Sequence, residues 1–168
     1  MVHLEGFDNE DTNQAQFERH AESVRTFTDI FEQHDGKLTF EAKPEFVAGC
    51  ENWNDNVLLE LYNQGNGIGI HADLGGQPDL DDSYYSFMVD SLEERKTNLE
   101  SLTGIEIRHV SGICSEVDWV SAAIEAGYEF TTGGVAYCLM SMLEDERPEE
   151  FKDCEGAGDC HEIFPTEL

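Results

Sequence analysis

Short apolar runs alternate with amphipathic segments along most of this chain. Runs typical of β-strands cover residues 2–5, 38–42, 67–72, 105–111 and 131–137. Between them, the spacing of apolar residues predicts helices over 13–33, 54–63, 82–102 and 118–126. Because no hairpin turn joins consecutive runs, we expect the strands to lie parallel in one α/β sheet or barrel with right-handed crossovers. Such folds gather their functional groups at the carboxyl ends of the strands.

Local signals refine this pattern. The expected core face of helix 13–33 consists of Phe17, Val24, Phe27, Ile30 and Phe31. After strand 38–42 we expect Pro44 and a turn at Gly49–Cys50. Gly65 is expected to close helix 54–63, and Asp81, Asp82 and Ser83 compete for the N-cap of helix 82–102.

The charge balance bears on possible partners. The chain has 168 residues, with 37 Asp and Glu against 9 Lys and Arg, and a formal net charge of −28. This charge repels a phosphate backbone, so we expect no nucleic-acid partner. The acids suit a surface adapted to high salt, divalent-cation binding or simple solubility. Because they are scattered through the chain, a solvated surface is favoured.

No part of the sequence predicts membrane association. No window reaches the roughly 18 apolar residues that a membrane span needs. The first residues, MVHLEGFDNE, lack the basic start and apolar run of a signal peptide. We therefore expect no membrane partner and no export signal within this chain.

The end of the chain departs from the strand–helix rhythm. We expect residues 1–143 to form the α/β domain and residues 144–168 to be an acidic, cysteine-containing loop or tail of the same domain. Cys154 and Cys160 bracket EGAGD, whose glycines would let the two sulfurs meet in a disulfide. A metal site that includes His161 is the alternative. A disulfide implies an oxidising compartment, extracellular or periplasmic.

Histidine–acid pairs stand at two predicted strand ends. His3 and Glu5 are two residues apart, as are His71 and Asp73, so each pair can project to one side of an extended segment and share a divalent cation. A single histidine in a strand is more often a hydrogen-bonded structural residue. Arg108 and His109 end a third predicted strand, where they would pair with surface acids or bind an oxyanion or substrate.

The order of these elements and three short motifs resemble the NodB-homology polysaccharide deacetylases. HLEG is similar to the family's first motif, TFDDG, with Glu5 in the place of the metal-binding acid and Leu4 in the place of the catalytic base. GIGIHADLGG is similar to the second motif, in which His71 matches the first metal histidine and Gly75 replaces the second. The segment Arg108–Gly112 is similar to the RxPYG motif and keeps its Arg and Gly.

This resemblance covers about residues 2–140. It implies an α/β fold, a parallel-stranded (β/α) barrel of the deacetylase type. Such a barrel needs roughly 200 residues or more. With about five βα units, the chain would be an incomplete barrel, either a piece of a longer protein or a shortened natural variant.

The resemblance also implies a metal-dependent hydrolase that removes N-acetyl groups from carbohydrate or acts on another small amide. Glu5, His71 and Asp73 would hold a divalent metal such as zinc, which acidifies the attacking water. Glu5 and Arg108 would be the catalytic residues, with Arg108 orienting the acids or the developing oxyanion. Because Leu4 and Gly75 replace a base and a ligand, the alternative is a catalytically inactive scaffold that binds carbohydrate or a partner.

Overall fold

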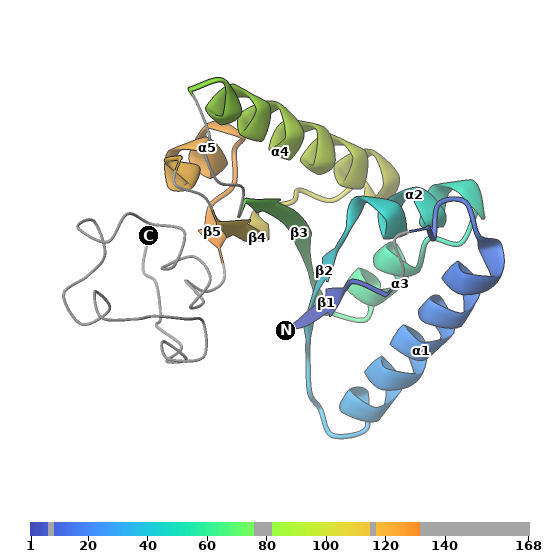
Figure 1. The fold of residues 1–168 in the computed structure, drawn as a ribbon. Coiled ribbons are helices and arrows are strands. Elements are labelled where there is room, and N and C mark those ends of the chain that lie inside the picture. The colour runs from blue at the N-terminus through green and yellow to red at the C-terminus, as the bar shows by residue number, and fades with distance from the viewer. Residues whose placement is uncertain (7–8, 76–81, 115–116, 132–168) are drawn as a thin grey trace, which may run out of the picture. The chain divides into compact units, whose positions relative to one another are not determined.

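A computed structural model describes residues 1–6, 9–75, 82–114 and 117–131 (Figure 1). Its elements are β1 (Val2–Leu4), α1 (Gln14–Glu32), β2 (Thr39–Ala42), α2 (Pro44–Asn52), α3 (Val57–Asn63), β3 (Gly67–Gly75), α4 (Asp82–Thr103), β4 (His109–Cys114), α5 (Trp119–Glu125) and β5 (Phe130–Thr131). The predicted tail, the Cys154–Cys160 pair and the fifth strand beyond Thr131 lie outside the described residues. None of the helices described is both long and apolar enough to cross a bilayer.

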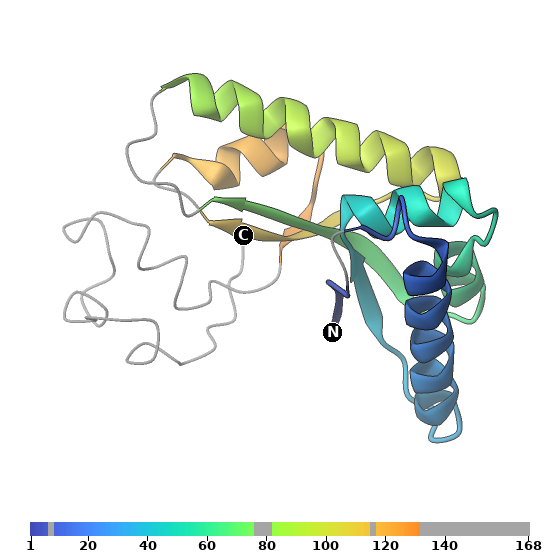
Figure 2. The same cartoon turned by 45° about the vertical axis from the view of Figure 1, so that its right-hand side comes forward.

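The strands form one parallel sheet in the order β1-β2-β3-β4-β5. In the β1–β2 register Val2 lies opposite Phe40, and in the β2–β3 register Phe40 lies opposite Ile68. Figure 2 shows β2 and β3 side by side. The prediction of a parallel α/β sheet is thereby confirmed. Because the strand order follows the chain order, every crossover steps to the next strand in the same direction.

The chain divides into two compact units. Among the described residues, the first comprises those of 1–71 and 94–107, and the second comprises those of 72–93 and 108–131. The first therefore holds β1, β2, the start of β3, the helices α1 to α3 and the end of α4.

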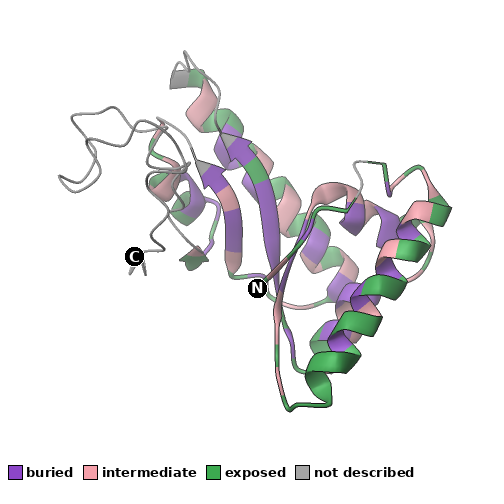
Figure 3. Ribbon diagram, turned by 60° about the horizontal axis from the view of Figure 1, so that its bottom comes forward, coloured by how far each residue is buried: buried purple, intermediate pink, exposed green. Residues whose placement is uncertain are grey.

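Aromatic and aliphatic side chains from these helices and strands form the core of the first unit. Phe17 of α1, Phe40 of β2 and Phe46 of α2 are fully buried, as are Leu58 and Leu61 of α3. The rings of Phe17 and Phe46 lie 5.4 Å apart between centroids. Figure 3 shows buried residues running along the strands and the inward faces of the helices. Burial of each such side chain stabilises the fold by about 1.5–3 kcal/mol.

Helix α1 begins and ends where the sequence predicts. Asn13 is its N-cap and accepts a hydrogen bond from the backbone N–H of Gln16, and Gln33 is its C-cap. The predicted core face was partly wrong. The buried residues are Phe17, Ala21, Val24 and Thr28. Phe27, Ile30 and Phe31 are exposed by 41%, 51% and 37%, because Phe27 and Ile30 lie off this stripe and Phe31 follows it near the helix end.

The segment after β2 is a helix, α2, where the sequence predicted a turn. Pro44 is its first residue, a position where the missing N–H has no partner to lose. Gly49 lies inside the helix because no side chain fits there. A Cβ atom on Gly49 would lie 2.6 Å from Phe17 Cδ2 and 3.1 Å from the carbonyl oxygen of Glu10.

Arg25 connects α1 to the start of α3. Its Nε donates to Glu60 Oε2 at 2.8 Å, and its Nη2 donates to Asp55 Oδ1 at 2.6 Å. Helix α3 itself is capped by Asn56, whose side chain accepts from the N–H of Leu59. As predicted, Gly65 follows the helix, with a φ of +88° that favours glycine.

In the second unit, β4 and β5 pair in parallel, with His109 opposite Phe130. Asp118 caps α5, and Gly127 follows it with a φ of +81°. The strand predicted over 105–111 occupies His109–Cys114 instead. Residues 105–108 therefore precede the strand, which changes the position of Arg108.

Candidate functional site

Two histidines and two glutamates from three adjacent strands meet in the first unit. His3 lies in β1, Glu5 follows that strand, Glu41 lies in β2 and His71 lies in β3. His3 is the register partner of Glu41, and Glu41 is the register partner of Gly69. Because side chains alternate along a strand, His71 shares the face of Gly69. The parallel register therefore gathers His3, Glu41 and His71 on one face of the sheet.

The other face of these strands is apolar and faces helices. Ile70, which alternates with His71, lines a cavity of about 130 Å³ together with Val47 of α2 and Asn98 of α4. Phe40 alternates with Glu41 and is fully buried. The polar cluster therefore projects from the face opposite to α2 and to the end of α4.

Each member of the cluster contacts another. His3 Nε2 lies 2.9 Å from Glu41 Oε2, and His3 Nδ1 lies 3.3 Å from Glu5 Oε1. His71 Nε2 lies 2.6 Å from the same Glu5 oxygen. The imidazole rings of His3 and His71 are stacked, with centroids 4.3 Å apart and an angle of 29° between their planes.

The cluster is closed at Glu41 and open at Glu5. The side chain of Glu41 is 0% exposed and that of His71 is 9% exposed. In contrast, His3 is 39% exposed and Glu5 is 47% exposed. A molecule in solution can therefore approach the cluster past His3 and Glu5, while the carboxylate of Glu41 lies at its base.

The donor set of this cluster fits a divalent cation. His3, Glu41 and His71 each offer one ligand atom, and these atoms all lie within 4.8 Å of one another. Ligands of a single zinc ion lie about 3–4 Å apart when each is at ~2.0–2.2 Å from the metal, so small side-chain movements would bring these atoms into ligand positions. Glu5 and Glu41 bring two carboxylates to the cluster, and such a cation would balance their negative charge.

The structure brings two of the predicted metal ligands, Glu5 and His71, together. The third, Asp73, does not have the regular strand geometry on which its prediction depended. Glu5 and His71 are in contact. Asp73 is exposed and has a left-handed φ of 49°, which interrupts the regular alternation that would put it beside His71. Among the described residues, the metal-type grouping consists of His3, Glu41 and His71 and does not include Asp73.

Glu41 was missed by the sequence analysis. It is a charged residue inside the apolar run TFEA of a strand that is buried on both faces, where near-continuous hydrophobic residues are the rule. This isolated acidic residue in an apolar run was the sequence signal that could have identified Glu41 as a candidate site residue. Its partner could not be inferred, because strand register is a property of the folded sheet.

Arg108 lies at a different position in the fold than predicted. Arg108 directly precedes β4, so it lies at the amino end of that strand rather than at the predicted carboxyl end. Its guanidinium pairs with Glu129 and lies 5.5 Å from the ring centroid of Phe130. Leu4, in the position of the family's base, is 1% exposed and belongs to the core.

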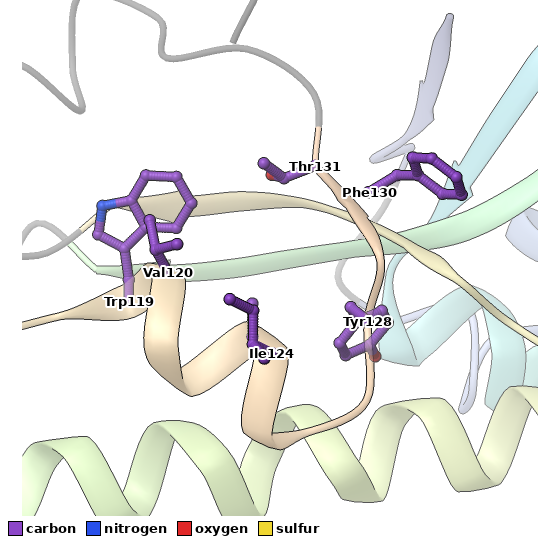
Figure 4. A pocket seen from close by; sticks show the side chains of 7 residues that line it. Trp119, Val120, Ile124, Tyr128, Phe130 and Thr131 are labelled. Carbon is purple, nitrogen blue, oxygen red and sulfur yellow. The ribbon is translucent and has the colours of Figure 1, made fainter. Parts of the chain in front are cut away.

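The second unit has a small apolar hollow beside α5, shown in Figure 4. Its walls include Trp119, Ile124, Tyr128 and Phe130. Its volume of about 10 Å³ is close to the minimum that holds one water molecule. The hollow therefore has no room for a substrate, and the His/Glu cluster is the stronger candidate for a functional site.

Comparisons with protein-family models, curated proteins and solved structures give no match to this chain.

Proposed function

We propose that this protein is a metal-dependent hydrolase that removes N-acetyl groups from carbohydrate. The observation that carries the proposal is the meeting of His3, Glu41 and His71 beside Glu5 on one face of a parallel α/β sheet. The substrate class rests on the resemblance of the sequence motifs to the polysaccharide deacetylases. The ligand set differs from the one that the motifs imply, because His3 and Glu41 join His71.

His3, Glu41 and His71 would hold the cation, and zinc suits a set of two nitrogens and one carboxylate oxygen. A divalent cation there supplies Lewis acidity toward a carbonyl and lowers the pKa of water. Glu41 contributes a carboxylate that solvent does not reach. His71, nearly buried, is oriented by its contact with Glu5.

Glu5 is the exposed carboxylate of the cluster and would act as its general base. It lies on the open side, within hydrogen-bonding distance of both imidazoles. A carboxylate in this position can accept a proton from water and donate it to a departing amine. Leu4 has no titratable atom and lies in the core, so the base would stand one residue later than in the family motif.

The sheet supports a barrel of the (β/α) type. Sequential strand order with crossovers in one direction is the winding of such barrels, whereas doubly wound sheets reverse direction. The face opposite the helices is the inner face of a barrel. The cluster of His3, Glu41 and His71 lies on that face, and Glu5 directly follows the carboxyl end of β1, the side of the strands on which barrel enzymes carry their active sites.

A carbohydrate-binding scaffold without turnover is the second candidate. The buried position of Leu4 favours it, because the family's base is then absent from its usual place. The two candidates differ in whether the protein releases acetate.

The test measures acetate release from N-acetylglucosamine oligomers, with zinc or cobalt added to the full chain. We expect release that is lost in Glu5→Gln and His71→Ala and unchanged in Glu22→Gln, an exposed glutamate of α1 outside the cluster. Oligomer binding without acetate release would support the scaffold. Neither binding nor release would overturn both candidates.

A further inference from the structure

Two described residues between β1 and α1, Gly6 and Glu10, contact one side chain of α1, His20. Gly6 directly follows Glu5, and its Cα faces the His20 ring. A Cβ atom at position 6 would lie 2.7 Å from Cε1 and 3.0 Å from Cγ of His20, closer than carbon atoms can approach without movement. The residue after Glu5 is therefore in close contact with the imidazole of His20.

His20 is itself held in place by a buried acid. Its Nδ1 lies 2.5 Å from Glu10 Oε1, and the Glu10 side chain is 1% exposed. The ring also meets Phe46 edge-on, with centroids 4.9 Å apart. If the ring moved away, the carboxylate of Glu10 would lose its imidazole partner in a buried position, which is costly.

The backbone of Glu10 is fixed as well. The indole Nε1 of Trp53 donates to the Glu10 carbonyl oxygen at 2.8 Å. Both ends of the connection are therefore tied to the helices: Gly6 through the His20 ring, and Glu10 through His20 and Trp53. Neither His20 nor Glu10 belongs to the metal-type grouping of the described residues.

We infer that His20 is a positioning residue for Glu5. By fixing the backbone at Gly6, it places the Glu5 carboxylate where it contacts both His3 and His71. This inference rests on the proposed metal site. Glu5 is the partner that orients His71, and alteration of such a partner changes metal affinity about 10–100-fold. Displacement of Glu5 through loss of the His20 contact should therefore weaken metal binding without removal of any ligand.

The experiment is a double-mutant cycle with Gly6→Ala, His20→Ala and the combined variant. Each full-length protein is titrated with Co²⁺ in excess Mg²⁺, which occupies surface acids, and the visible absorption that His71→Ala abolishes is taken as the site's signal. We expect Gly6→Ala and His20→Ala each to weaken Co²⁺ binding about tenfold and to change the spectrum. The combined variant should bind Co²⁺ with the same affinity as His20→Ala, because the methyl group added at position 6 then has no imidazole ring to clash with.

Two comparisons separate this inference from general destabilisation and from failure of the metal site. Val24→Ala, a buried residue one turn further along α1, should lower the thermal midpoint but leave the Co²⁺ affinity and spectrum of the folded protein unchanged. Unchanged binding in His20→Ala, or additive effects in the combined variant, would overturn the role of His20. If the unmodified protein shows no His71-dependent Co²⁺ signal, the proposed function fails instead.

Discussion

His3 and Glu41 are direct partners in the β1–β2 register, and the Nε2 atom of His3 lies 2.9 Å from Oε2 of Glu41. The pair joins an exposed imidazole to a carboxylate that solvent does not reach. Burial of a carboxylate is costly unless a partner compensates it, and at this position the imidazole of His3 or a bound cation is that partner.

Glu41→Gln should remove zinc stabilisation and leave the metal-free protein nearly unchanged. Gln keeps the shape and an acceptor oxygen but lacks the charge that a cation requires. We expect zinc at 100 times its dissociation constant to raise the free energy of unfolding by about 2.7 kcal/mol in the unmodified protein and by much less in the variant. Thermal unfolding with and without zinc measures this, with Glu22→Gln as the matched control. Equal shifts in all three proteins would contradict the ligand role.

Arg25 should stabilise the contact between α1 and α3. The hydrogen bonds that Arg25 donates to Asp55 and Glu60 raise the pKa of Arg25 further above its ordinary value, so the group stays charged throughout the working range. Its bonds to two carboxylates form a small network, and we expect Arg25→Ala to cost about 1–2 kcal/mol in urea unfolding. Arg25→Lys keeps the charge but not the forked geometry, so its free energy of unfolding should lie between those of the unmodified protein and Arg25→Ala. Equal stability of Lys and Ala variants would show that geometry, not charge, carries the effect.

Asp118 should contribute stability that disappears in acid. Hydrogen bonds from the backbone N–H and then the hydroxyl of Ser121 lower the pKa of its carboxyl group. A pKa lowered by folding means that the stabilisation is complete above the unfolded-state value and is lost as the pH falls through the folded-state value. Asp118→Ala should cost about 1 kcal/mol at neutral pH, and the difference should shrink below about pH 4. Asp118→Asn, which can cap but not titrate in this range, is the control; a difference between Asp and Ala that is constant with pH would contradict the prediction.

Salt should stabilise the protein. The net charge of −28 makes the acids repel one another, and the screening length falls from about 30 Å at 0.01 M to 3 Å at 1 M. The thermal midpoint should therefore rise between these KCl concentrations. A flat profile would show that other interactions compensate the repulsion.

The Cys154–Cys160 disulfide stays a prediction of the sequence. Alkylation of the native protein without reductant, followed by peptide mapping, should leave both residues unlabelled and joined. Cys50 is the internal reference, because burial raises the pKa of its thiol to about 12 and keeps it unreactive until the protein unfolds. Labelling of Cys154 and Cys160 in the native protein would refute the disulfide and remove the argument for an extracellular or periplasmic location.

Much of the local structure could be predicted because its causes are local. The ends of α1 follow from Asn13 and Gln33, and the end of α3 from Gly65, since caps and left-handed glycines act within one helical turn. Helix α3 begins at Val57, three residues later than predicted, because Asn56 is its N-cap. Helix α2 was not predicted, because Gly49 was interpreted as a turn residue. Gly49 is needed inside the helix because the ring of Phe17, a residue distant in the sequence, leaves no room for a side chain there.

The sequence by itself determined the alternation of strands and helices and the parallel sheet, and it selected Glu5 and His71, which the structure places in contact. Only the tertiary structure decided that Glu41 joins His3 and His71, that Asp73 leaves the regular strand geometry, and that Arg108 precedes β4. The physical reason is strand register. Side-chain alternation is a property of each strand, whereas which residues lie opposite one another depends on how the strands pair in the folded sheet.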